Sequence, residues 1–135
     1  MGLGRIGPVV YTHTMIKFTD IDTDNIYVAA RWGYWGHVGE DETFNDKGER
    51  VSWTMYLNDP EDVDGYTPKR IDGDALAKAA SSILDLEVKV GSYVYDMLVE
   101  DLRDWRESPQ YGVPFDADLS DILVQVACFG EVIFG

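Results

Sequence analysis

The spacing of apolar residues changes near residue 72, and this change limits the folds that the chain can adopt. Before it, large apolar side chains alternate with smaller or more polar ones, in the order Val51, Ser52, Trp53, Thr54, Met55, Tyr56 and Leu57. This period of two predicts a strand with one buried face. Beyond residue 72, apolar residues recur three and four positions apart, as in a helix with one buried stripe. Strands followed by helices predict an α+β domain, with an antiparallel sheet and the helices packed on one of its faces.

Two further segments of the first half have the composition of strands. Residues 9–18 and 26–35 are rich in β-branched and aromatic side chains, which strands prefer. Together with residues 51–57, they predict an antiparallel meander of three long strands.

The segment between these strands predicts a hairpin. Asn45 and Asp46 suit a tight turn, and Gly48 can adopt the positive φ of a bulged loop. The short stretch Glu42–Phe44 would then form a fourth strand of the sheet.

The second half predicts about three helices, at residues 72–84, 92–108 and 118–130. Asp72 or Asp74 can cap the first, and Gly130 can end the third. Residues 58–71 contain two prolines, a glycine and several acids, so we expect an irregular crossing segment there. The tail Val132–Phe134 is expected as a short edge strand.

Length and composition predict one soluble domain that spans residues 1–135. The chain is 45% hydrophobic and 13% aromatic, which is enough to build a core and argues against disorder. No apolar run approaches the roughly 18 residues of a membrane helix, and the first residues lack the layout of a signal peptide. A single cysteine, Cys128, excludes an internal disulfide and favours the cytoplasm.

The chain is strongly and unevenly acidic. It has 25 acidic and 11 basic residues, a net charge of -14, and no acid among its first 19 residues. Such a field repels nucleic acid and anionic membranes and favours basic protein partners. We therefore expect no direct binding of nucleic acid and no membrane partner.

Two groups of carboxylates are candidates for binding a basic partner. One lies in the segment after the second expected strand and contains Glu40, Asp41 and Glu42. The other forms a stripe on the second expected helix and contains Asp96, Glu100, Asp104 and Glu107. The most specific form of this hypothesis is DNA mimicry. The helix alone carries one charge per roughly 6 Å, against one per about 1.7 Å of duplex axis, so loop carboxylates would have to contribute.

Asp20, Asp22 and Asp24 have the spacing that opens a calcium-binding loop. That loop needs Gly at its sixth position and Glu at its twelfth, where this chain has Asn25 and Arg31. We expect an acidic β-turn between two strands, with no metal and no cofactor. A domain that binds cations through these carboxylates stays open as an alternative.

The residues that most often perform catalysis are few. His13 and His37 are the two histidines, and His37 lies near Glu40 and Asp41, so an acid–base pair is conceivable. Cys128 lies among apolar residues, where burial raises the pKa of a thiol. A small enzyme that uses residues 37–41 is an alternative, but a non-enzymatic role is favoured.

The aromatic segment at residues 31–37, RWGYWGH, is a third candidate surface. Flat rings beside glycine can form a stacking surface. We expect Trp32 and Tyr34 to pack in the core and Trp35 to be exposed or to lie at an interface. A homo-oligomeric structural component that uses Trp32, Tyr34 and Trp35 is a further alternative.

The C-terminal stretch DLSDILVQVACFGEVIFG resembles the ending of small uncharacterised proteins encoded by phages of actinobacteria. The likeness covers about 20 of the 135 residues and depends on an apolar helix followed by Phe129, Gly130, Glu131 and a final Gly135. It implies a phage gene product that acts in the host cytoplasm, and it supplies no catalytic residues. The function predicted from the sequence is a non-enzymatic acidic protein-binding domain that engages a basic host factor, such as a DNA-binding protein.

Overall fold

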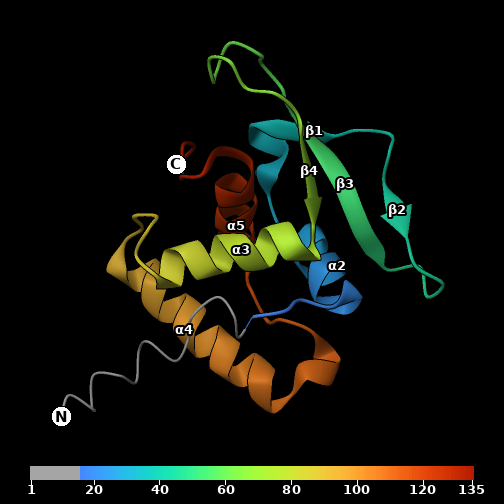
Figure 1. Ribbon diagram of the computed structural model, residues 1–135, viewed down its shortest axis with the longest axis vertical. Coiled ribbons are helices and arrows are strands. Elements are labelled where there is room, and N and C mark those ends of the chain that lie inside the picture. The colour runs from blue at the N-terminus through green and yellow to red at the C-terminus, as the bar shows by residue number, and fades with distance from the viewer. Residues whose placement is uncertain (1–15) are drawn as a thin grey trace.

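The computed structural model describes residues 16–135, which form an α+β fold (Figure 1). An antiparallel sheet of four strands is combined with four α-helices and two short 3₁₀-helices in this part of the chain. The strands are β1 (Gly36–Val38), β2 (Thr43–Phe44), β3 (Arg50–Leu57) and β4 (Lys69–Asp72). The α-helices are α2 (Asp20–Ala29), α3 (Gly73–Leu84), α4 (Ser92–Glu107) and α5 (Ala117–Phe129). The 3₁₀-helices are η2 (Trp32–Tyr34) and η3 (Pro109–Tyr111).

Strand β3 is the centre of the sheet. Met55 pairs with Val38 of β1 and with Lys69 of β4, so these two strands lie on opposite sides of β3. Strand β2 pairs with the other end of β3, on the same side as β1. The predicted alternation is confirmed, because Trp53, Met55 and Leu57 are buried. The predicted hairpin and short fourth strand are confirmed as well, and Gly48 has a φ of +79°.

The three helices predicted for the second half are present as α3, α4 and α5. Asp72 caps α3 by accepting a hydrogen bond of 2.9 Å from the backbone N–H of Ala75. Asp116 caps α5 in the same way, two residues before the predicted start. Gly130 ends α5 in the left-handed conformation. The largest fully buried side chains, which connect these helices to the sheet, include Trp53, Leu76, Ile83, Leu98, Leu102, Leu119 and Leu123. None of the helices in residues 16–135 is both long and apolar enough to cross a membrane.

The prediction for residues 20–35 is wrong. Asp20–Ala29 is a helix rather than an acidic turn followed by a strand. The helix begins with a capping box, in which Asp22 accepts a 2.8 Å hydrogen bond from the backbone N–H of Thr19. A helix also turns Ile26 into the core, where it is fully buried. The strand expected at residues 26–35 is therefore absent, and the first strand of the described residues, β1, begins at Gly36, after η2.

Three smaller expectations also need correction. Of the strand predicted at residues 9–18, residues 9–15 lie outside the described part, and residues 16–18 are irregular. Strand β4 forms at the end of the expected crossing segment. The tail at residues 132–134 is not a strand, because the side chain of Gln125 replaces a strand partner. Its Oε1 accepts hydrogen bonds from the backbone N–H groups of Ile133 and Phe134.

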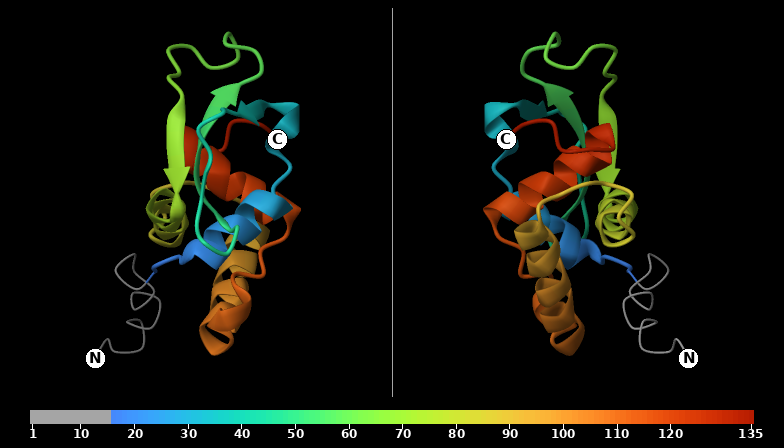
Figure 2. Two further views of the ribbon diagram at one scale, coloured as in Figure 1. Left: turned by 90° about the vertical axis from the view of Figure 1, so that its right-hand side faces the viewer. Right: turned by 90° about the vertical axis from the view of Figure 1, so that its left-hand side faces the viewer.

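Helix α4 and the β3–β4 loop lie at opposite ends of the molecule in all views (Figures 1 and 2). This loop spans residues 58–68 and contains four exposed carboxylates, those of Asp59, Glu61, Asp62 and Asp64. The fold therefore separates two acidic regions by the body of the domain.

Candidate functional site

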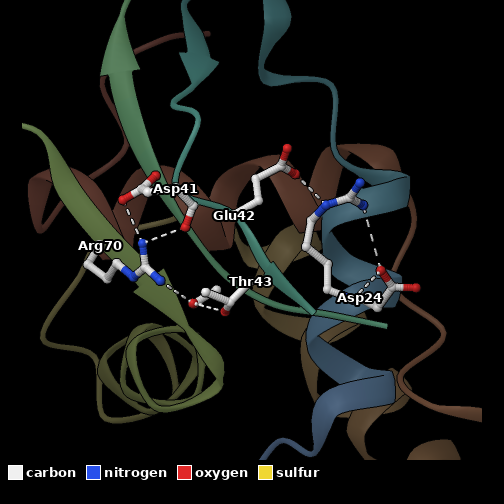
Figure 3. Close-up of polar contacts among 7 residues, drawn as sticks. Asp24, Asp41, Glu42, Thr43 and Arg70 are labelled. Atoms are coloured by element: carbon white, nitrogen blue, oxygen red, sulfur yellow. Dashed lines mark hydrogen bonds and ion pairs between the residues drawn. The ribbon is translucent and has the colours of Figure 1, made fainter. Parts of the chain in front are cut away.

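Two of the three carboxylates predicted at residues 40–42 are engaged by arginines of the sheet (Figure 3). Asp41 pairs with Arg70 and also accepts a hydrogen bond from the hydroxyl of Thr54. The Thr54 hydroxyl, followed by the more weakly acting Arg70, lowers the pKa of Asp41 below its usual value. Glu42 pairs with Arg50. The charges of Asp41 and Glu42 are thus compensated, whereas Glu40 is exposed and takes part in none of the ion pairs found between described residues.

Arg50 connects the sheet to α2. Its guanidinium lies 3.7 Å from Asp24, which also accepts a hydrogen bond from the backbone N–H of Arg50. It also lies over the ring of Tyr27, 3.7 Å from the ring centroid, and over that of Phe44 at 4.9 Å. We call Asp24, Asp41 and Glu42 with Arg50 and Arg70 the sheet-side pairs.

Asp20, Asp22 and Asp24 do not converge on one point. The helix places Asp22 in the core, where its carboxylate is 0% exposed and accepts a 3.0 Å hydrogen bond from the indole of Trp105. Asp20 accepts a hydrogen bond from Asn45, and Asp24 is held by Arg50. Within residues 16–135, no group of three or more side chains is arranged to hold a metal ion.

The aromatic segment presents a different ring from the one expected. Trp35 is buried, with 1% exposed, and its indole N–H donates a 2.8 Å hydrogen bond to Asp121. Its ring stacks on that of Phe134, with the centroids 5.4 Å apart. Trp32 is buried against Trp53, as predicted, whereas Tyr34 is 56% exposed. Of these three aromatic residues, Tyr34 is therefore the one at the surface, because both tryptophans are turned inward.

Of the groups considered for catalysis, His13 lies outside the described residues, and His37 and Cys128 are engaged in structural contacts. His37 stacks on Tyr56, and its Nδ1 lies 3.0 Å from Oδ1 of Asn58 rather than from a carboxylate. Cys128 is buried, and burial raises the pKa of its thiol to about 12. A thiol with this pKa is almost entirely protonated at neutral pH and is a poor nucleophile.

The carboxylates of α4 are in different surroundings from the sheet-side pairs. Asp96, Glu100, Asp104 and Glu107 are all exposed. The ion pairs found between described residues involve Arg50 and Arg70, and none of them includes these four carboxylates. Arg103 and Arg106 also lie on α4, so the helix itself carries bases that reduce its net charge.

A fifth carboxylate on α4, that of Asp101, is close to several others. Partial burial, together with the charges of Asp116, Asp104 and Glu100, raises the pKa of Asp101 to about 6. Burial is the largest cause of this shift, and the three neighbouring carboxylates add to it, because like charges close together disfavour the ionised form. We call the set Asp96, Glu100, Asp101, Asp104, Glu107 and Asp116 the α4 face.

An open groove of about 650 Å³ lies beside the α4 face. It is formed by the first turns of α4 and α5, by η2 with Arg31, and by the C-terminal tail. Its apolar lining includes Val94, Met97, Leu119, Ile122, Val132 and Phe134. Its polar lining consists of Arg31, Tyr34, Tyr93, Asp116, Asp118 and Asp121.

Sequence reasoning had missed Asp101, Tyr93 and the acids at the start of α5. A usable signal was present for Asp101, because it lies four residues after Met97 and four before Trp105, at the edge of the apolar stripe. For Asp116 and Asp118 there was none, because their proximity to α4 depends on how the two helices pack. A scan against protein-family models found no match, and comparisons with curated proteins and with solved structures found none either.

Proposed function

We propose that this chain is a non-enzymatic, protein-binding domain whose α4 face engages a basic surface of a partner protein. The observation that supports this best is the difference in pairing. The carboxylates of the sheet-side pairs are matched by Arg50 and Arg70. The exposed carboxylates of α4 lie near Asp116, and none of them takes part in an ion pair found between described residues.

Concentrating like charges costs free energy in the isolated protein. A partner that brings lysine or arginine side chains to the α4 face would relieve this repulsion and would be attracted from a distance. The raised pKa of Asp101 agrees with such a local excess of charge. Solubility alone would not require the carboxylates to be gathered on one helix.

The resemblance of the C-terminal stretch to phage proteins adds a setting to this proposal. In that setting the partner is a basic factor of the host, and the domain acts in the cytoplasm. DNA mimicry is the most specific form of the proposal, in which Asp116, which caps α5, and Asp118, in its first turn, extend the row of carboxylates on α4.

The proposal can be tested with a fluorescent oligolysine as a basic probe. Asp96→Asn, Glu100→Gln and Asp104→Asn are combined in one variant. The matched control combines Glu61→Gln, Asp62→Asn and Asp64→Asn in the β3–β4 loop, which removes the same charge at the opposite end of the domain (Figure 1). At about 0.1 M salt we expect the α4 variant to bind about tenfold more weakly and the loop variant to change less than about threefold.

Equal losses in the two variants would mean that net charge, rather than the α4 face, attracts the probe. Binding that persists at about 1 M salt, where exposed charges more than about 3 Å apart are screened, would also contradict the proposal. Circular dichroism of both variants checks that the fold is intact.

A further inference from the structure

The groove beside the α4 face is held in shape by a buried hydrogen-bond network. Asp121 accepts hydrogen bonds of 2.9 Å from the hydroxyl of Tyr34, 2.8 Å from the indole of Trp35 and 3.1 Å from the amide of Gln125. Gln125 in turn binds the backbone of Phe134. One carboxylate therefore fixes both the Tyr34 wall and the tail wall of the groove, so the groove exists before any partner arrives.

The groove has an apolar lining and an exposed aromatic edge. Val94, Met97 and Ile122 contribute apolar surface, and the tyrosine at the start of α4, Tyr93, is 75% exposed. Concave, mostly apolar sites with a few polar groups are where proteins preferentially bind ligands. Tyrosine is also enriched among the residues that contribute most to protein interfaces.

The charge around the groove selects the occupant. Its lining contains three carboxylates and one base, namely Asp116, Asp118, Asp121 and Arg31. Asp121 is buried and occupied by the network, while Asp118 is exposed. The carboxylates of the α4 face continue this negative potential along α4. An occupant must therefore bring apolar side chains and positive charge together.

We infer that the groove binds an amphipathic segment of the partner protein that has an apolar face and lysine or arginine side chains beside it. The apolar face lies on Val94, Met97 and Ile122, and the cationic side chains lie toward Asp118 and the α4 face. This inference rests on the proposed function and specifies the kind of partner surface. Recognition of this type corresponds to a helix in a groove, with apolar anchors three, four and seven residues apart.

The test compares two fluorescent peptides of the same composition, each about 14 residues long. In one, leucines recur three and four positions apart among lysines; in the other, the order is scrambled. Charge is identical, so attraction to the α4 face alone would bind both equally. We expect the amphipathic peptide to bind about tenfold more tightly in fluorescence anisotropy titrations.

Variants of two equally exposed tyrosines distinguish binding in the groove from binding elsewhere on the surface. Tyr93→Ala should weaken binding of the amphipathic peptide about tenfold or more. Tyr111→Ala is the matched control, since Tyr111 is 74% exposed and is absent from the groove lining. It should change binding less than about twofold. Asp118→Asn should weaken binding, and Arg31→Ala should strengthen it, because they change the charge of the lining in opposite directions.

The outcomes distinguish this inference from the proposed function. If both peptides bind with equal affinity and Tyr93→Ala has no effect, the α4 face binds basic proteins and the groove does not take part. If neither peptide binds at about 0.1 M salt, the proposed function fails as well. A protein that sediments as a dimer and is dissociated by Tyr93→Ala would assign the groove to a second copy of the chain and would overturn the inference.

Discussion

The sheet-side pairs and the α4 face both contain carboxylates at the surface of one acidic domain, but these carboxylates have different neighbours. On the sheet, Arg50 and Arg70 reach carboxylates that lie 8 to 29 residues away in the sequence. On α4, carboxylates lie mainly beside other carboxylates. Long-range electrostatic potential depends on unmatched charge. The net charge of -14 therefore does not indicate where the domain is most negative.

Buried carboxylates show a third arrangement. Asp22 and Asp121 are each held by neutral donors, and each binds the indole of a buried tryptophan. Such groups support the fold and are unavailable to a partner. If this division is correct, removing a buried carboxylate, a sheet-side base or an α4 carboxylate should have three different effects on stability.

The largest effect is expected for Asp22→Ala. The substitution leaves the buried indole N–H of Trp105 without its acceptor, and it removes the half of the capping box in which Asp22 accepts from the backbone N–H of Thr19. We expect a loss of about 3 kcal/mol in the free energy of unfolding, measured by urea denaturation. Asp20→Ala, in the same turn but exposed, is the control and should cost less than about 1 kcal/mol. Equal costs would contradict a structural role specific to Asp22.

A smaller loss is expected for Arg50→Met, which keeps an unbranched apolar stem but removes the charged guanidinium. Asp24 and Glu42 would lose their ion-pair partner while remaining partly buried. We expect a loss of about 2 kcal/mol, less than for a fully buried pair because water reaches these groups. Arg103→Met on α4, where the arginine is exposed, should change stability by less than about 0.5 kcal/mol. If Arg50→Met left the free energy of unfolding unchanged, the sheet-side pairs would contribute little to stability, and the contrast with α4 would disappear.

Helices and strands with a regular spacing of apolar residues and a clear end signal could be predicted from the sequence. Strand β3 followed from alternation, and α3 and α5 followed from apolar spacing together with Asp72 and Gly130. Helix α2 was missed because its β-branched and aromatic residues favour strands, although Thr19 and Asp22 have the spacing of a capping box. In that case, local capping and the burial of Ile26 outweighed weak strand propensity.

The candidate site was less predictable than the fold. The stripe on α4 followed from helical spacing once the helix was recognised. By contrast, the pairing of Asp41 with Arg70 depends on strand register across 29 residues, and the burial of Trp35 depends on contacts with Asp121 and Phe134. A local pattern contains no information on such distant contacts. The groove was unpredictable for the same reason, because it joins segments from four parts of the chain.

The smallest effect, and the one of opposite sign, is expected for Asp101→Asn on the α4 face. The pKa of Asp101 is about 6 in the folded protein, raised from 3.8 by burial and by neighbouring carboxylates. Between these two values the unfolded chain releases its proton while the folded protein keeps it. Stability contributed by the protonated group is therefore complete below about pH 4 and is lost as the pH rises through 6.

Asparagine does not ionise, so the variant escapes this loss. We expect Asp101→Asn to be more stable than the unsubstituted protein by about 1 kcal/mol above pH 6, a figure reduced for solvent screening of a partly exposed group. The pH-dependent part of this difference should vanish below about pH 4, as measured by urea denaturation across this range. Asp96→Asn removes an exposed carboxylate from the same helix and should show a much smaller dependence on pH. A stabilisation that is the same at all pH values would indicate better packing of asparagine rather than a raised pKa of Asp101, and neither burial nor the neighbouring carboxylates of the α4 face would then disfavour its ionised form.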